Sequence, residues 1–169
     1  MKPSYHSIEA RSYGICRVAS HNFWVLRNED DQVISELHGL ATDRVTNRFK
    51  PIGIFNDRLG FYEFKRADNA PSFISDKQKS VTIFQGYKEE ALACWNKAAF
   101  QVKELNKKDI NYSPFGIFGF PVANSNSAYH LFAHFMGFEC CYFSKVLQPG
   151  INNKLAFCHL SNSRSKNTI

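Results

Sequence analysis

The sequence lacks any long apolar run. No stretch of its 169 residues approaches the roughly 18 apolar residues that a membrane-spanning helix needs. The first residues, Met1 to Arg11, are polar and contain no apolar segment of the kind found in secretory signals. We therefore expect a soluble chain without a conventional signal peptide. Export by another route, or release from a longer protein, remains compatible with this pattern.

Metal, phosphate and disulfide signatures are also missing. The five cysteines are odd in number and show no CxxC spacing, and a bridge between the adjacent Cys140 and Cys141 would be strained. His130 and His134 lie four residues apart, but no Glu follows His130, so the zinc pattern HExxH fails. The glycines of residues 116–119 have no following Lys to bind phosphate. We expect no metal and no cofactor.

The composition is that of one globular domain. Apolar residues make up 44%, charged residues 21% and aromatic residues 15%, with sixteen Phe available for a core. We expect a flexible lead-in over residues 1–10, a domain over residues 11–160 and a polar tail over residues 161–169. The net charge of +6 favours a solvated basic surface over an anionic partner, for which nucleic acid, a membrane surface and a cell-wall polymer are the alternatives. The motifs of the chain do not indicate nucleic-acid binding. Nucleic acid is not an expected partner.

Two types of secondary structure occupy different parts of the chain. Alternating and β-branched residues predict strands at Ser20–Asn28, Gln32–His38, Pro51–Phe55, Gly60–Lys65, Ser80–Phe84 and Phe138–Val146. Polar or Gly- and Pro-containing loops are predicted at Leu40–Lys50, Ala67–Lys79 and Tyr112–Val122. Apolar residues at helical spacing predict helices at Tyr87–Lys107 and Ser125–Met136. This partial segregation of strands and helices indicates an α+β fold, an antiparallel sheet packed against two helices.

A histidine at the start of a predicted hairpin is the first candidate for chemistry. The polar turn at residues 28–31 lets Ser20–Asn28 and Gln32–His38 pair. Strand alternation then allows His21 to approach Glu36 or His38. A histidine held by a carboxylate or an imidazole forms the base-and-orienter pair of nucleophilic catalysis. A histidine that is only satisfied at a strand edge is the simpler alternative.

The segment Asn124-Ser125-Asn126-Ser127 precedes the second predicted helix and is the second candidate. Asn and Ser are preferred N-caps, so this segment is a helix start in any interpretation. A nucleophile at a helix N-terminus also lies next to N–H groups that stabilise developing negative charge. Ser125 is the expected nucleophile, and Ser127 is the alternative if the helix begins later.

Together, SHNFWVLRNEDDQVISELHG and NSNSAYHLFAHFMGF resemble the circularly permuted branch of the NlpC-type papain-like superfamily, which includes lecithin:retinol acyltransferase-like proteins. The resemblance implies a papain-like fold in which His21 is the base. Glu36 or His38 would be the orienting residue, and Ser125 would be the nucleophile. Asn124, Asn126 and Asn22 would be supporting residues.

Ser125 departs from the family pattern, in which the nucleophile is Cys. A hydroxyl needs a stronger base and better orientation than a thiol. The resemblance implies a hydrolase or acyltransferase that cleaves a cell-wall peptide amide, or alternatively a lipid ester. It also suggests an antibacterial effector toxin that acts in the bacterial periplasm and has an immunity-type protein partner. A catalytically dead binding module, in which Asn124–Ser127 only caps a helix, is the other alternative.

Overall fold

The structure is a computed structural model, and it describes residues 5–15, 19–50, 53–114, 122–145 and 147–152. The strands are β1 (Tyr5–Ile15), β2 (Ala19–Arg27), β3 (Val33–Thr42), β4 (Phe49–Lys50), β5 (Arg58–Lys65) and β6 (Lys79–Tyr87). The helices are α1 (Lys88–Ala99), α2 (Gln101–Asn106) and α3 (Ser125–Met136), with one short 3-10 turn, η1 (Arg66–Asp68). The expected polar tail at residues 161–169 lies outside the described residues.

The strands form one six-stranded antiparallel sheet, so the predicted α+β class is confirmed. The sheet order is β4-β3-β2-β1-β6, and β5 pairs with β3. The predicted hairpin is present as β2 and β3, with Val25 opposite Glu36. Strand β6 forms one edge, and its register against β1 shifts between Ile8 and Glu9. Such an irregularity twists an edge strand and makes it a poorer template for another strand.

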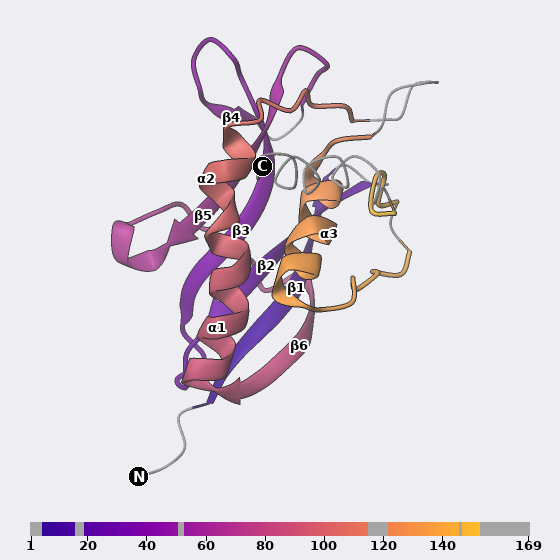
Figure 1. The fold of residues 1–169 in the computed structure, drawn as a ribbon. Helices are drawn as coiled ribbons and strands as arrows, with labels where there is room; N and C mark the ends of the chain where they lie inside the picture. Colours follow the sequence, from indigo (N-terminus) through magenta and orange to yellow (C-terminus); the bar gives the residue numbers. More distant parts are fainter. Residues whose placement is uncertain (1–4, 16–18, 51–52, 115–121, 146, 153–169) are drawn as a thin grey trace, which may run out of the picture.

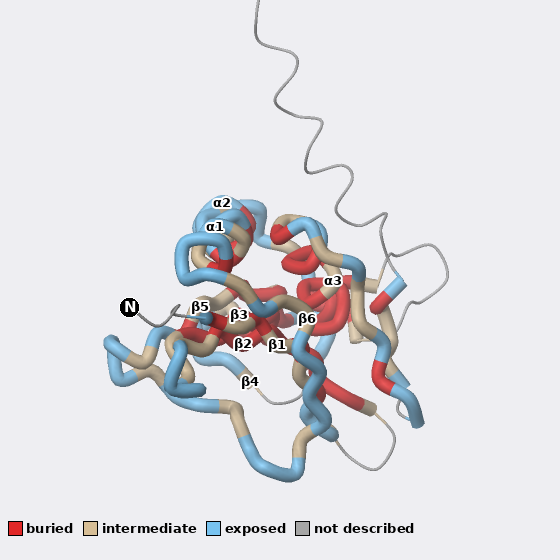
Figure 2. Tube along the Cα trace, turned by 90° about the horizontal axis from the view of Figure 1, so that it is seen from below, coloured by how far each residue is buried: buried red, intermediate tan, exposed pale blue. Residues whose placement is uncertain are grey.

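The three helices cover one face of the sheet (Figure 1). Helices α1 and α2 run along the sheet beside α3. Figure 2 shows the buried residues concentrated between these helices and the strands, and most of α3 is buried. Trp24 of β2 anchors this layer by stacking on Tyr129 at 4.8 Å and donating its indole N–H to the Tyr129 carbonyl at 2.9 Å. The indole therefore contributes buried apolar area to the packing without leaving its N–H group unpaired.

The helix boundaries follow local sequence signals. The predicted helix Tyr87–Lys107 is present as α1 and α2, which are separated at the exposed Phe100. Helix α3 has the predicted bounds because Asn124 caps its start and Gly137 ends it with φ 84°. Within the described residues, none of these helices has the length and apolarity needed to cross a lipid bilayer.

Four predictions about local structure are wrong. The predicted loop Leu40–Lys50 contains the end of β3 and all of β4. Residues 5–10, expected in a flexible lead-in, belong to β1, which lies between β2 and β6 inside the sheet. Residues 53–55 form no strand; the strand there is β4, which precedes the predicted one. Residues 138–145 form no strand either, although Phe143 is buried. In each case tertiary pairing, which short-range alternation does not encode, decided the outcome.

Gly39 of β3 lets α3 approach the sheet closely. A Cβ atom added to Gly39 would lie 2.1 Å from the Cβ of Ala128, near the start of α3. Real atoms do not approach so closely, so a larger residue must push the helix away. The absence of a side chain at Gly39 therefore sets the distance between the sheet and the N-terminal end of α3.

We expect Gly39→Ala to lower the free energy of unfolding by about 1–3 kcal/mol because it overpacks this contact. Gly14→Ala is the matched control, since no atom lies within 4 Å of a Cβ built at Gly14 of β1. Urea denaturation of the two variants measures the difference. Equal stability of the two variants would contradict the close-approach argument.

Candidate functional site

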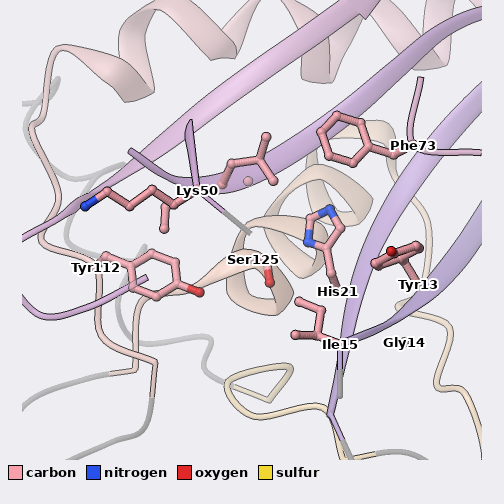
Figure 3. A pocket seen from close by; sticks show the side chains of 11 residues that line it. Tyr13, Gly14, Ile15, His21, Lys50, Phe73, Tyr112 and Ser125 are labelled. Carbon is pink, nitrogen blue, oxygen red and sulfur yellow. The ribbon is translucent and has the colours of Figure 1, made fainter. Parts of the chain in front are cut away.

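The candidate site lies where strands β2 and β3 separate. Their described pairing runs from Arg27 opposite Val33 to Trp24 opposite Leu37, and it does not extend to the His21 end of β2. A cavity of about 290 Å³ opens at this divergence (Figure 3). Its walls come from four strands, the loop before β6, the segment after α2 and the start of α3. They include Ile15, His21, Leu40, Phe73, Tyr112 and Ser125.

His21 and His38 bridge the two separating strands. Strand alternation turns both side chains to the sheet face opposite the helices, where both are buried. The His21 Nε2 and the His38 Nδ1 are 2.9 Å apart, and the two rings are nearly parallel with centroids 5.2 Å apart. Phe73 packs on His38 from the loop between β5 and β6, with centroids 4.5 Å apart. The prediction left Glu36 and His38 open as the neighbour of His21, and the structure places His38 there.

Glu36 lies one step further along the same chain of contacts. Its Oε2 is 2.9 Å from the His38 Nε2. The carboxylate is fully buried and also accepts from the guanidinium of Arg66, from the Ser72 hydroxyl at 3.0 Å and from the Phe73 N–H at 3.2 Å. All of these partners are donors, and Arg66 carries a positive charge, so Glu36 is held as a carboxylate.

The tautomers of both histidines follow from this hydrogen-bond network. A carboxylate only accepts, so the His38 Nε2 carries the proton and its Nδ1 is the acceptor. The His21 Nε2 must then donate to His38, which leaves the Nδ1 of His21 as a bare acceptor. Figure 3 shows that this second nitrogen of the His21 ring faces Ser125. Glu36 thus determines, through His38, which atom of His21 can receive a proton.

Burial keeps both imidazoles neutral. Burial, together with the neighbouring His38, lowers the pKa of His21 well below 6.5. Burial lowers the pKa of His38 to about 3. Loss of water around an imidazolium disfavours the charged form, which explains the direction of both shifts. His21 is therefore a base that is available at neutral pH but weak.

Ser125 reaches the cavity from the first position of α3. Its side chain points toward the His21 ring in Figure 3, and Tyr112 lines the same cavity. Burial raises the pKa of Tyr112 to about 12, so this hydroxyl remains a donor at neutral pH. No direct hydrogen bond joins Ser125 to His21 within the described residues. Catalytic contacts are often loose in a free enzyme, so their shared cavity keeps the pair a candidate.

Ser127, the alternative nucleophile, has a structural environment. Its fully buried hydroxyl lies 3.1 Å from the Val122 carbonyl and 3.2 Å from the Gly150 carbonyl, to which it can donate. It also receives the N–H of Asn124 at 3.4 Å, while the Asn124 side chain accepts from the N–H groups of Asn126 and Ser127. Ser127 is therefore part of the capping box of α3 and not of the cavity wall.

Asn22 and Asn126 attach the start of α3 to strand β2. The Asn22 N–H donates to the Asn126 Oδ1 at 3.1 Å, and the Asn126 Nδ2 donates to the Ser20 carbonyl at 3.0 Å. Asn22 also donates to Gln148 at 2.6 Å. These contacts fix Ser125 relative to His21 without placing either amide in the cavity. Both amides therefore hold the start of α3 against β2.

His130 and the cysteine pair are the other residues that the sequence brings into question. His130 contacts the Ile151 carbonyl at 2.5 Å, and the described residues contain no cluster of three or more metal-ligating side chains. Burial raises the pKa of Cys140 to about 12 and raises the pKa of Cys141 as well. Raised thiol pKa values disfavour the reactive thiolate. Both pKa shifts work against a nucleophilic role for Cys140 and Cys141.

Sequence reasoning missed three residues of this site. Arg66 directly precedes the predicted exposed loop Ala67–Lys79, and Phe73 lies within it. Tyr112 is the first residue of the predicted loop Tyr112–Val122. No local pattern marks them, because their partners Glu36, His38 and Ser125 are distant in sequence. Sheet pairing of β3 with β5 brings Arg66 to Glu36, while Phe73 and Tyr112 line the cavity itself.

Comparison of the chain with family models, curated protein sequences and solved structures finds no match. The resemblance to permuted NlpC-type proteins therefore stays a prediction that depends on the residues described above.

The buried neutral histidines predict a pH dependence of stability. Below pH 6.5, His21 and His38 bind protons in the unfolded chain but not in the folded one. The free energy of unfolding therefore decreases as the pH is lowered. The slope from each histidine rises to on the order of 1 kcal/mol per pH unit once the unfolded histidine is fully protonated, and for His38 it continues toward pH 3. His38→Gln should reduce the slope of unfolding free energy between pH 6.5 and 5 by one histidine's share. His134→Gln, on the exposed side of α3, should leave it unchanged; equal slopes in both variants would refute the assignment.

The tautomer chain predicts a spectroscopic signature. Nitrogen-15 chemical shifts of the histidine rings should show His21 and His38 as neutral Nε2–H tautomers at pH 7. Glu36→Gln should abolish the single tautomer at His38, because an amide can donate as well as accept. Glu104→Gln, on the exposed face of α2, is the control that should change nothing. A protonated Nδ1 on His21 in the unmodified protein would contradict the network.

Proposed function

We propose that the chain is an acyl hydrolase or acyltransferase in which Ser125 is the nucleophile and His21 the general base. The observation that carries this proposal is the order of groups at one cavity. Ser125 faces the bare nitrogen of His21, and a hydrogen-bonded line runs from His21 through His38 to the buried carboxylate of Glu36. This is the nucleophile, base and orienting group that acyl transfer requires.

In the proposed first step, the Ser125 Oγ attacks the carbonyl carbon of the substrate and its proton passes to the Nδ1 of His21. The carbonyl π electrons move to oxygen and form an oxyanion. The N–H of Ser125 at the start of α3 and the hydroxyl of Tyr112 are the donors available to that oxyanion. The imidazolium that forms on His21 is stabilised by donation to His38, which in turn donates to Glu36.

In the second step, the tetrahedral intermediate collapses and the leaving group takes the proton from His21. An acyl group then remains on the Ser125 Oγ. Water, or an acceptor hydroxyl or amine, attacks this ester while His21 removes its proton. The bond from the acyl carbon to the Ser125 Oγ then breaks, and His21 returns the proton to that oxygen as the product leaves. The imidazolium of His21 is a strong acid because its pKa is lowered, and it therefore protonates a poor leaving group well.

The serine demands more from this site than a cysteine would. A hydroxyl is far less acidic than a thiol, and burial makes His21 a weak base. The ionised Glu36 offsets part of this cost, because it stabilises positive charge on the histidine pair as that charge develops. We expect turnover to depend on the hydrogen bonds from His21 through His38 to Glu36 more than it would in a cysteine enzyme.

The substrate is either a cell-wall peptide amide, the first expectation from the resemblance, or a lipid ester. The cavity wall favours the second candidate. Ile15, Leu40 and Phe73 contribute apolar side chains, and the single cation among the described lining residues, Lys50, already pairs with Asp43 and Asp57. Such a wall suits an uncharged acyl group better than the charged side chains of a cell-wall peptide. An effector toxin with an immunity-type partner is the biological setting that the resemblance suggests.

Ser125→Ala should reduce hydrolysis of phospholipid vesicles or of cell-wall fragments about a thousandfold or more. Ser127→Ala should keep the chemistry while costing about 1 kcal/mol of stability through the lost cap. Unfolding curves of both variants separate loss of fold from loss of chemistry. Full activity of Ser125→Ala would refute the enzyme and leave a binding module whose Asn124–Ser127 segment only caps a helix.

Ser125→Cys tests the same site without a substrate. A thiol beside the bare nitrogen of His21 should be alkylated by iodoacetamide faster than Cys94, Cys140 or Cys141, as measured by peptide mass spectrometry. The additional change His21→Ala should remove this excess reactivity. Equal alkylation rates with and without His21 would show that the two groups do not communicate.

A further inference from the structure

Two turns project together from one end of the sheet. One connects β3 to β4 over residues 43–48, and the other, residues 53–57, precedes β5; Figure 1 shows the loops beside β4. Lys50 connects the two turns, because its Nζ lies 2.9 Å from Asp43 and 2.7 Å from Asp57. Arg58 adds a second link by donating to Asn47 at 3.1 Å.

The turns present apolar side chains to solvent. Val45 is 88% exposed, Ile54 is 59% exposed and Phe55 is 52% exposed. Single exposed apolar residues are ordinary, but three of them on two linked turns form a distinct surface. We refer to Val45, Ile54 and Phe55 as the apolar tips.

The backbone of both turns is held in place by the two aspartates. Asp43 accepts the N–H groups of Val45 at 3.0 Å and Thr46 at 2.9 Å. The nearly buried Asp57 accepts the N–H of Ile54 at 2.9 Å. The apolar tips are therefore presented by fixed turns, so little conformational entropy is lost when a surface contacts them.

Positive charge surrounds the apolar tips. Asp43 and Asp57 are paired with Lys50, and Asp109 is paired with Arg44 at 2.5 Å. Among the described residues, no carboxylate pairs with Arg48 or Arg58. Four cations, Arg44, Arg48, Lys50 and Arg58, therefore face three carboxylates on this surface, an excess of one positive charge in a chain whose net charge is +6.

We propose that the apolar tips and the surrounding arginines form a docking surface for a lipid bilayer with anionic headgroups. Apolar side chains that insert at the headgroup boundary, flanked by Lys or Arg, are the chemistry of interfacial membrane attachment. Lys50 joins the turns and also lines the cavity, so docking would bring the cavity wall near the membrane. This inference does not depend on the chemistry of Ser125.

Co-sedimentation of the full chain with sucrose-loaded vesicles tests the proposal. The vesicles contain either phosphatidylcholine alone or a mixture of phosphatidylcholine and phosphatidylglycerol. All proteins carry Ser125→Ala, so that hydrolysis cannot consume the lipid. We expect binding to the anionic vesicles to exceed binding to the neutral ones about tenfold or more, and to weaken as salt is raised.

Ile54→Ser combined with Phe55→Ser should lower the partition coefficient on anionic vesicles about tenfold or more. Arg48→Ser should lower it about fivefold. The matched control is Phe100→Ser, because Phe100 is 76% exposed between α1 and α2 and outside the two turns. Circular dichroism and unfolding curves confirm that each variant is folded.

Three results would overturn the proposal: no binding of the parent protein to anionic vesicles, equal binding to neutral vesicles, or an equal loss in Phe100→Ser. The first would assign the apolar tips to a protein partner instead. Loss of catalysis in Ser125→Ala leaves this assay unaffected, so failure of docking and failure of the proposed chemistry are distinguished.

Discussion

The ionised carboxylate of Glu36 is the constraint on which the site depends. It has no exposed surface, and a buried charge persists only when it is paired and fully hydrogen-bonded. Arg66, Ser72 and Phe73 supply three donors from the chain that follows β5, and His38 supplies the fourth. This single group therefore both fastens the loop against the sheet and fixes the tautomer of the histidine pair.

The separation of β2 from β3 opens the cavity beside the histidine pair that Glu36 orients. If the strands paired along their full length, the histidines would be ordinary cross-strand neighbours with no cavity beside them. Because they diverge, the start of α3 can reach His21, with Asn126 bonded to β2 and Gly39 leaving room for Ala128. The contacts that pack α3 on the sheet therefore also determine the position of Ser125.

The burial that orders these groups also limits their reactivity. Desolvation lowers the pKa values of His21 and His38, which keeps them neutral but makes them reluctant to accept a proton. In the reaction proposed above, such a site would favour a transition state in which positive charge is spread from His21 through His38 toward Glu36. The apolar wall of the cavity would strengthen these hydrogen bonds further when a substrate excludes water.

Turn and capping residues that are close together in the sequence were sufficient to predict some helices and strands. The polar turn after Asn28 predicted the β2–β3 hairpin, and the capping pattern before Ser125 with Gly137 after it predicted both ends of α3. Strand alternation was sufficient to place His21 with Glu36 or His38, because a period of two fixes which side chains share a face. The sequence could not choose between these two partners, since that choice depends on where the strands separate.

Only the tertiary structure decided the remaining features, because they depend on contacts between residues far apart in the chain. Strand β1 begins at Tyr5 because β2 and β6 pair with it on both sides, not because its first residues favour a strand. From the sequence, Arg66 is expected to be exposed to solvent. In the fold it pairs with the buried carboxylate of Glu36, which lies thirty residues earlier in the chain. The meeting of Tyr112 and Ser125 in one cavity likewise requires the finished packing of α3 against the sheet, which no local pattern encodes.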